Sequence, residues 1–309
     1  MSDPADRRPL DCRSMRSAGP GRGRPDAPQD RGAGRDGDAA DAGATPGGAH
    51  DAAGTTAATG VGAAAMPARD TAPDGGPDMA LRPTGPRVAG FAPPPPPGPG
   101  RIAGDHVALE RLDPDRHAAD LFAANRGQDW VWDYLGYGPF RDLGTYRDWQ
   151  AGMAAARDPF FYALRDSASG RVGGLAAFLR IDPAQGVIEI GHIQIAPPMQ
   201  RSLAATEAIS LMIGWAFGAG YRRVEWKCDA LNAASRRAAL RYGFRFEGIF
   251  RQHMIYKGRN RDTAWYAIID RDWPRLAGAY RAWLAPANFD ADGRQRQSLS
   301  AMTAAPRDS

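Results

Sequence analysis

The chain has 309 residues, a formal net charge of +4 and a pI of about 9.3. No apolar run approaches the roughly 18 residues that cross a bilayer, and the two cysteines, Cys12 and Cys228, support neither a disulfide framework nor a Cys-ligated zinc site. We therefore expect a cytoplasmic protein without a bound metal and without a membrane partner. The mildly basic charge fits a solvated surface, an anionic cofactor or an RNA-rich partner, but no RNA-binding motif favours the last.

The first 80 residues differ in composition from the rest of the chain. They contain no Phe, Trp, Tyr, Ile, Lys or Glu, and their charges are nine Arg and twelve Asp among Ala, Gly and Pro. Such a segment cannot bury enough apolar surface to offset the entropy of ordering it. The sequence therefore predicts a disordered tail over residues 1–80.

A proline-rich segment follows, and we place the start of the folded domain directly after it. Residues 81–104 include Pro93–Pro97, which favours polyproline II, so we predict a stiff linker there. Residues 105–285 are long enough for one domain. The polar residues 286–309 are predicted to form a flexible C-terminal tail.

Hydrophobic periodicity and turn residues predict an alternation of strands and helices in this domain. A helix is expected to begin at Asp113 and Pro114, since these are good N-cap and first-turn residues, and to run to about Asn125. The other predicted strands are His106–Leu112, Phe160–Arg165, Val172–Ile181, Val187–Ile195, Arg222–Asp229, Phe246–Tyr256 and Thr263–Ile269. The other predicted helices are Thr145–Arg157, Arg201–Gly218, Asn232–Tyr242 and one that begins near Asp272. Hairpins mixed with crossover helices indicate an α+β fold with a mixed sheet rather than a doubly wound parallel one.

Two strand-to-helix connections are the segments of the sequence that most clearly indicate a binding site. In Val187–Thr206 a strand runs through a Pro-containing turn directly into a helix. The first N–H groups of that helix are unpaired and lie at the positive end of its dipole, which suits a phosphate. Asp229–Gly243 is a second connection of the same kind, so two strand ends are expected to lie side by side.

The order of these motifs resembles the GCN5-related N-acetyltransferase (GNAT) superfamily, and most closely the ribosomal-protein alanine acetyltransferases of the RimJ/RimL type. The resemblance rests on Gln200-x-x-x-x-Ala205 before a long helix, Asn232-x-x-Ser235, and Gly243-Phe244. It covers about residues 105–275. It implies a mostly antiparallel sheet with two central parallel strands that splay apart and flanking helices. It also implies acetyl-CoA as co-substrate.

The resemblance further implies which residues hold acetyl-CoA. Pantetheine would pair with the strand backbone, and pyrophosphate would lie on the loop and the helix that follow. The residues implied are Ile193, Gln194, Ile195, Gln200, Arg201, Ser202, Leu203, Ala204, Ala205, Thr206, Asn232 and Ser235. The chain departs from the family pattern at Leu203, where a glycine is usual, and at Ala239, where many relatives carry a general-acid tyrosine. Leu203 can keep helical dihedrals if its side chain turns into the core.

Amide formation from a thioester needs a neutral amine and a leaving thiolate. Glu189 is the preferred general base, because its strand ends at the expected cofactor site, and Glu247 is the runner-up. Ser235 is the expected proton donor to the thiolate, although Asn232 and Ser235 also suit helix capping. His192 and Cys228 are interpreted as packing residues.

Aromatic residues gather in one short segment before the second helix. Trp130, Trp132, Tyr134 and Tyr137 are expected to line the acceptor site, with core packing as the alternative. The predicted activity is transfer of an acetyl group to a primary amine, either a protein N-terminus or a small molecule. The alternatives are an acyl-CoA-binding module with weak turnover and a ribosome- or RNA-associated factor. A monomer and a homodimer both fit the sequence.

Overall fold

The computed structural model describes residues 84–304, and from Val88 onward the chain forms one compact unit. The predicted tail over residues 1–80 lies outside the described residues. The strands are β1 Arg101–Ala103, β2 Val107–Arg111, β3 Phe160–Asp166, β4 Val172–Asp182, β5 Val187–Ile195, β6 Arg223–Asp229, β7 Arg245–Tyr256 and β8 Arg259–Ile269. The α-helices are α1 Pro114–Ala124, α2 Leu143–Ala155, α3 Leu203–Gly218, α4 Ala233–Arg241, α5 Trp273–Leu284 and α6 Leu299–Thr303. Short 3-10 turns occupy Asp129–Trp132, Pro197–Met199, Asp270–Asp272 and Pro286–Asn288.

The strands form one sheet in the order β1-β2-β3-β4-β5-β6-β8-β7. Neighbouring strands run antiparallel except β5 and β6, which are parallel. This is the predicted mixed α+β fold with two central parallel strands. The strand that the sequence did not predict is β1, whose three residues lie inside the expected linker and pair with β2.

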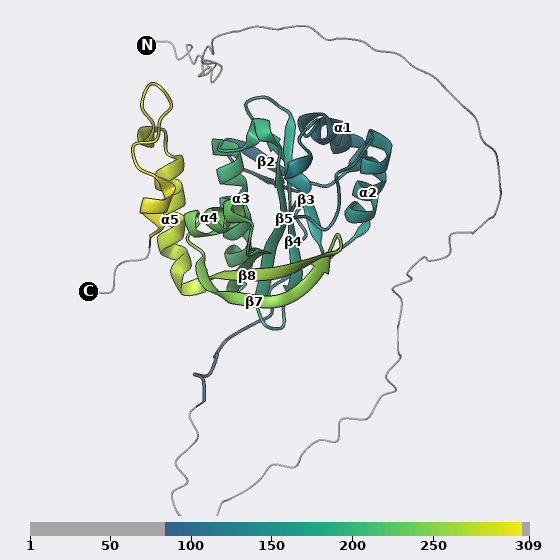
Figure 1. Cartoon of the computed structure of the whole chain (residues 1–309). Coiled ribbons are helices and arrows are strands. Elements are labelled where there is room, and N and C mark those ends of the chain that lie inside the picture. The colour runs from purple at the N-terminus through teal and green to yellow at the C-terminus, as the bar shows by residue number, and fades with distance from the viewer. Residues whose placement is uncertain (1–83, 305–309) are drawn as a thin grey trace, which may run out of the picture. The chain divides into compact units, whose positions relative to one another are not determined.

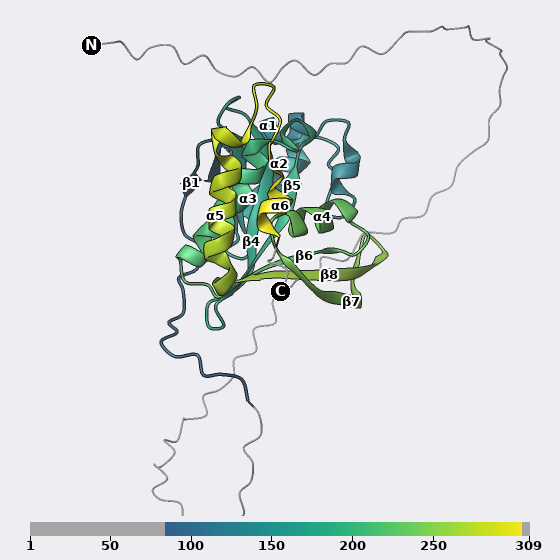
Figure 2. The same ribbon diagram turned by 90° about the vertical axis from the view of Figure 1, so that its left-hand side faces the viewer.

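Helices cover both faces of the sheet (Figure 1). On one face, α3 packs between the sheet and α5, and Figure 2 shows these two helices side by side. Apolar side chains from alternate strand positions, such as Ile188, Ile190 and Val224, meet Ile209 and Met212 of α3 in the larger core. On the other face, α1 and α2 cover β3 and β4 over a smaller aromatic core.

Capping side chains define where the helices begin. Asp113 accepts a hydrogen bond from Asp115 N at the start of α1, as expected for its type. Asp142 does the same for Thr145 N at α2, and Ser202 for Ala205 N at α3. Each predicted helix is therefore present, with ends within two residues of the prediction. In the described part of the chain, no helix combines the length and apolar character needed to span a bilayer.

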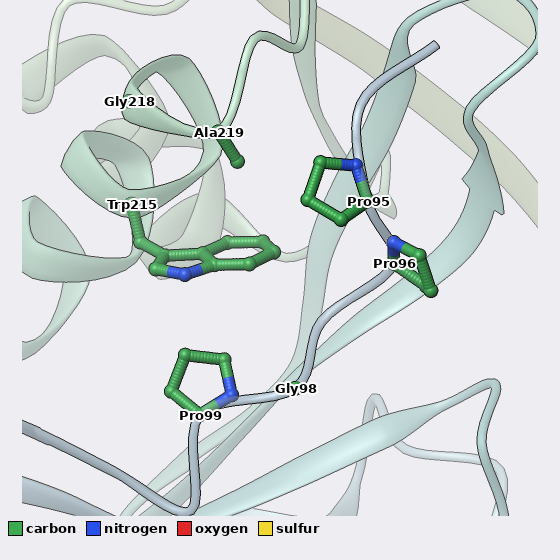
Figure 3. A pocket seen from close by; sticks show the side chains of 7 residues that line it. All are labelled: Pro95, Pro96, Gly98, Pro99, Trp215, Gly218 and Ala219. Carbon is green, nitrogen blue, oxygen red and sulfur yellow. The ribbon is translucent and has the colours of Figure 1, made fainter.

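The proline-rich segment packs on the domain instead of forming a spacer. Pro94 and Pro97 are buried, and backbone carbonyls of Pro95 and Pro99 accept hydrogen bonds from the hydroxyls of Tyr221 (3.2 Å) and Tyr162 (2.9 Å). Pro95, Pro96 and Pro99 lie around the indole of Trp215, which Figure 3 shows facing Pro95 and Pro99. The polyproline conformation leaves its carbonyls free, so they can accept these bonds.

The C-terminal segment is also ordered where we predicted a flexible tail. Leu299 and Thr303 of α6 are buried, and Thr303 donates to the carbonyl of Arg241 at 2.9 Å. Asn288 is buried and donates to the carbonyls of Trp283 and Gln297. A few apolar residues and internally satisfied amides thus suffice to fix residues 286–304, despite their polar composition.

Candidate functional site

The central parallel strands separate along their length. β5 and β6 pair through Val187, Ile188 and Glu189, opposite Arg223, Val224 and Glu225, and their register ends there. The backbone of β5 beyond Glu189 therefore has no strand on its β6 side in the described part of the chain. Unpaired backbone groups at the centre of a sheet need another partner, and an extended ligand can supply one.

A β-bulge lies on the same stretch of β5. The β4–β5 register pairs Ala177 with Gly191 and Leu175 with Gln194, so β5 has one extra residue at His192 and Ile193. His192 takes a positive φ of 49°. The bulge shifts which backbone groups point toward the opening between the strands.

The N-terminus of α3 lies at the end of this strand. The carbonyl of Ile195 accepts a hydrogen bond from Nε2 of Gln200, which ties the connecting loop to β5. Ser202 caps the helix and also donates to the carbonyl of Met199 at 2.7 Å, so its hydroxyl is used within the loop. The N–H groups of Leu203 and Ala204 in the first turn donate to no acceptor in residues 84–304 and are available to an anion.

The loop between β5 and α3 has Leu203 at the position where a glycine was expected. Leu203 is the first residue of α3 and packs partly buried against the core, so it keeps helical dihedrals as expected. The left-handed conformation falls instead on Arg201, with φ of 59° and an exposed side chain. Ala204, Ala205 and Thr206 are buried in the first turn, where Thr206 donates to the carbonyl of Ser202.

The first turn of α4 faces the end of β6. Asn232 caps the helix by accepting from the N–H of Ser235 at 3.0 Å. The Ser235 hydroxyl accepts from Nε1 of Trp226 at 2.9 Å, which leaves its own proton for another acceptor. Burial raises the pKa of the Cys228 thiol, which favours its protonated form.

The predicted cofactor residues on β5 divide between the faces of the sheet. Ile193 and Ile195 pack partly buried against the larger core. Gln194 is buried on the other face, where its Nε2 donates to Oδ1 of Asn125 at 2.6 Å. For these three residues, the side chains are used for packing and only the backbone is left for a ligand.

Glu189 lies in a buried charge cluster rather than at an open surface. Its side chain is 4% exposed, and Oε2 accepts from Arg180 at 2.7 Å and lies 3.0 Å from Nζ of Lys227. Lys227 also contacts Glu225 at 2.7 Å. Oε1 of Glu189 lies over Gly191, where a Cβ would come within 3.2 Å of it. The runner-up base, Glu247, is paired with Arg223 at the opposite end of β6 from the separated strands.

The aromatic segment divides into core and surface residues. Trp132 packs in the smaller core against Phe140 and Tyr146, so it does not line an acceptor site as expected. Trp130 is 53% exposed, and its Nε1 donates to Gln128. A large aromatic side chain beside a sheet can either pack in the core or line the acceptor site. The sequence alone does not distinguish these two positions.

Two of the tyrosines do reach the site. The Tyr137 ring stacks on His192 with centroids 5.7 Å apart, and a 3.1 Å hydrogen bond joins its hydroxyl to Nδ1. The Tyr134 hydroxyl donates to the carbonyl of Leu231, in the turn before α4. The pKa of His192 is lowered to about 4, first by burial and then by the charges of Arg180 and Arg261, so the ring is neutral at physiological pH.

Sequence reasoning missed several charged residues beside the separated strands. Arg241 of α4 donates to the hydroxyl of Thr206, which places its guanidinium at the first turn of α3. Lys227 and Arg180 meet at Glu189 although they lie on different strands. Nothing in their local sequence marks them, because their meeting depends on the register of β4, β5 and β6.

No cluster of three or more potential metal ligands occurs among the described residues.

Residues 106–245 match the model of the Acetyltransferase (GNAT) domain family. A GCN5-related N-acetyltransferase from Brucella melitensis is 46% identical, with a TM-score of 0.68 over 70% of this chain and 99% of that one. A probable GNAT-family acetyltransferase from Chromobacterium violaceum is 40% identical, with a TM-score of 0.60 over 63% of this chain and 98% of that one.

A shorter similarity links the chain to a curated protein, the uncharacterized N-acetyltransferase YoaA of Bacillus subtilis. The two are 38% identical over 82 residues, which is 26% of this chain and 46% of YoaA. The parallel strands that separate, the bulge on β5 and the first turn of α3 all lie within residues 106–245, which match the family model. The chain therefore belongs to the GCN5-related N-acetyltransferase family of acyltransferases.

Proposed function

We propose that this protein transfers the acetyl group of acetyl-CoA to a primary amine by direct attack of the amine on the thioester. The observation that carries the proposal is the separation of β5 from β6 beside a helix N-terminus with free N–H groups. An extended pantetheine chain has the amide groups to pair with the free edge of β5. The pyrophosphate has the charge to bind the first turn of α3, with Arg201 and Arg241 close by.

In the proposed reaction, the amine nitrogen forms a bond to the carbonyl carbon and the carbon–sulfur bond breaks. The tetrahedral oxyanion needs a hydrogen-bond donor, and backbone N–H groups released by the bulge at His192 and Ile193 are suited to this. The Ser235 hydroxyl, whose oxygen already accepts from Trp226, donates a hydrogen bond to the leaving thiolate, and the thiolate is protonated by solvent, to which the proton removed from the amine is returned. Because thiols have a reference pKa near 8.5, this leaving group needs only modest help.

Glu189 is the proposed acceptor of the amine proton. Arg180 and Lys227 both bind Oε2, and Oε1 has no hydrogen-bond partner among residues 84–304. Since the side chain is nearly inaccessible, we propose that a water molecule relays the proton to Oε1. An α-amine has a reference pKa of about 8, so its deprotonation near neutral pH demands little of the base.

Two measurements on the full chain test the proposal. Acetyl-CoA should raise the Tm by mass action, and release of the CoA thiol should depend on an added amine. An unchanged Tm at millimolar acetyl-CoA would sink the cofactor site. A raised Tm without thiol release from any amine would identify the protein as an acyl-CoA-binding module instead.

A further inference from the structure

Part of the connection between α1 and α2 reaches across to the other half of the sheet. The carbonyl of Trp132 accepts a hydrogen bond at 2.7 Å from Nζ of Lys257, in the turn between β7 and β8. The hydroxyl of Tyr134 donates at 3.3 Å to the carbonyl of Leu231, in the turn between β6 and α4. We call residues 129–137 the strap, since they join elements on both sides of the separated strands.

The strap is anchored on the β5 side by buried rings. Trp132 packs in the smaller core. The Tyr137 ring lies 4.4 Å from that of Trp149 in α2, and its hydroxyl shares a 3.1 Å hydrogen bond with Nδ1 of His192 on β5. Hydrogen bonds therefore hold the strap at three places: the bulge of β5, the β7–β8 turn and the β6–α4 turn.

These three places lie around the part of the sheet where β5 and β6 have separated. On β5, His192 is three residues beyond Glu189, the last residue that pairs with β6. On the other side, Leu231 is two residues beyond Asp229, the last residue of β6. A segment bonded to both positions crosses the opening between the two strands.

The strap crosses on the same face of the sheet as Glu189. Ile188 and Ile190 point into the larger core, which α3 covers, so Glu189 between them points to the opposite face. That is the face of the smaller core, where Trp132 of the strap packs. Figure 1 shows the β7–β8 hairpin extending toward α2, and its turn is bonded to the strap there. An amine whose proton passes to Glu189 therefore enters between the strap and the strands.

We propose that the strap restricts the acceptor to primary amines whose neighbouring carbon is unbranched, an inference that rests on the acetyl transfer proposed above. When the nitrogen reaches the thioester, the groups on its neighbouring carbon lie between the strap and the sheet. The strap is held on both sides of the opening, so it moves outward only if the bonds to Lys257 and Leu231 break. Extra methyl groups in a space of fixed width are unfavourable, as in an overpacked core. The substrate class is therefore amines of the form –CH2–NH2, with Lys257 and Tyr134 as positioning residues.

The kinetic experiment offers acceptors that differ only in branching to the full chain with acetyl-CoA. They are glycinamide, alaninamide and valinamide, and rates are expressed per neutral amine so that differences in amine pKa cancel. We expect kcat/KM to fall about 10- to 100-fold from glycinamide to valinamide, the usual effect of forcing extra methyl groups into a fixed space.

Two variants release the strap without changing the residues that bind acetyl-CoA. Lys257→Met removes the ammonium donor, and Tyr134→Phe removes the hydroxyl but keeps the ring. Each should lower the KM for valinamide and reduce the preference for glycinamide about 2- to 10-fold, the weight of one hydrogen bond. In Lys257→Met, kcat with glycinamide should stay unchanged. Arg259→Met removes a charge from an exposed position of the same hairpin and should keep the wild-type preference.

Equal kcat/KM for the three amides in the wild-type protein would overturn the inference and leave acetyl transfer intact. A preference that survives in both Lys257→Met and Tyr134→Phe would overturn it as well, because branching would then be sensed elsewhere. Absence of transfer to any amine would contradict the proposed function instead.

Hydrogen exchange tests the strap without turnover. The backbone N–H groups of Val131 and Asp133 form hydrogen bonds within the 3-10 turn of the strap. Their exchange should become about 2- to 10-fold faster in Lys257→Met and stay unchanged in Arg259→Met, since only the first variant removes a bond that holds this turn. Identical exchange in the wild type and Lys257→Met would mean that the hairpin does not hold the strap, and the inference would fail.

Discussion

Nζ of Lys227 lies 3.0 Å from Oε2 of Glu189, although Lys227 is two residues beyond the last pair that β6 forms with β5. The same ammonium lies 2.7 Å from Glu225, so it joins carboxylates from both strands on one face of the sheet. It thereby fixes the spacing of β5 and β6 where their backbone pairing ends. Both cationic neighbours of Glu189 contact Oε2, and its Oε1 has no hydrogen-bond partner among residues 84–304.

Glu189→Gln tests the proposed base. We expect turnover to fall about 10²- to 10⁴-fold, because the amide cannot accept the proton, while KM for acetyl-CoA barely changes. Raising the pH should recover part of the rate, since more of the amine is then already neutral. Glu225→Gln is the matched control, since it removes the other carboxylate of Lys227 without touching the base. Normal turnover in Glu189→Gln at pH 7 would assign deprotonation to solvent.

Lys227→Met tests the buried cluster itself. The change leaves Glu189 and Glu225 buried without their shared cation, so the free energy of unfolding should fall by about 3–5 kcal/mol in urea. Adding Glu225→Gln to this variant should restore part of the loss, because it removes a buried carboxylate that has lost Lys227 and keeps only Arg223 as a partner. A loss below about 1 kcal/mol would show that the cluster is solvated in solution.

Arg201 allows the charge and the backbone conformation to be separated. Both Arg201→Ala and Arg201→Gly remove the guanidinium, whereas only glycine relaxes the positive φ of the loop. If the side chain contacts the pyrophosphate, both variants should weaken acetyl-CoA binding by about 1.5–3 kcal/mol in calorimetry. Arg201→Gly should at the same time have a higher Tm than Arg201→Ala. Unchanged affinity in both variants would leave phosphate binding to the helix N–H groups and Arg241.

His192 predicts a pH dependence of stability. Its pKa is about 4 in the folded protein and about 6.5 in the unfolded chain, so below pH 6.5 the unfolded state binds the proton more readily. Unfolding free energy should therefore decrease as the pH falls from 6.5 to 4, by up to about 3 kcal/mol from this group. Replacing it in His192→Gln should flatten this part of the profile, as followed by urea unfolding at each pH. An unchanged slope would place the ring in a solvated environment.

The proline-rich segment provides a test by truncation. A chain that begins at Val88 should unfold as the full chain does, whereas one that begins at Arg101 loses buried Pro94 and Pro97 and the hydrogen bonds from Tyr162 and Tyr221. We expect the shorter chain to have a Tm lower by several degrees, since each kcal/mol shifts the Tm by about 2–4 °C in a domain of this size. Equal Tm values would mean that the segment contributes no stability.

Local patterns determined most of the fold. The alternation in Val187–Ile195 and the caps at Asp113 and Asn232 predicted the elements on which the site is built, and the structure confirms them. The partners of Glu189 were not predictable, because a bulge and strand register bring Arg180 and Lys227 to it. We expected Trp132 at the acceptor site and a flexible tail from residue 286, but Trp132 and several side chains of residues 286–304 are buried. Composition does not reveal which aromatic or polar side chains have packing or hydrogen-bond partners inside the protein.

The three residue pairs between β5 and β6 also affect how firmly the two halves of the sheet are held together. They join one half of the sheet, β1 to β5, to the other half, β6 to β7, and α3 is the covalent connection between them. A molecule lying between the separated strands would form hydrogen bonds with the backbone where the two strands no longer pair with each other. Its arrival should slow amide hydrogen exchange along the far end of β6 as well as along β5, so slower exchange on both strands would show that the bound molecule bridges them.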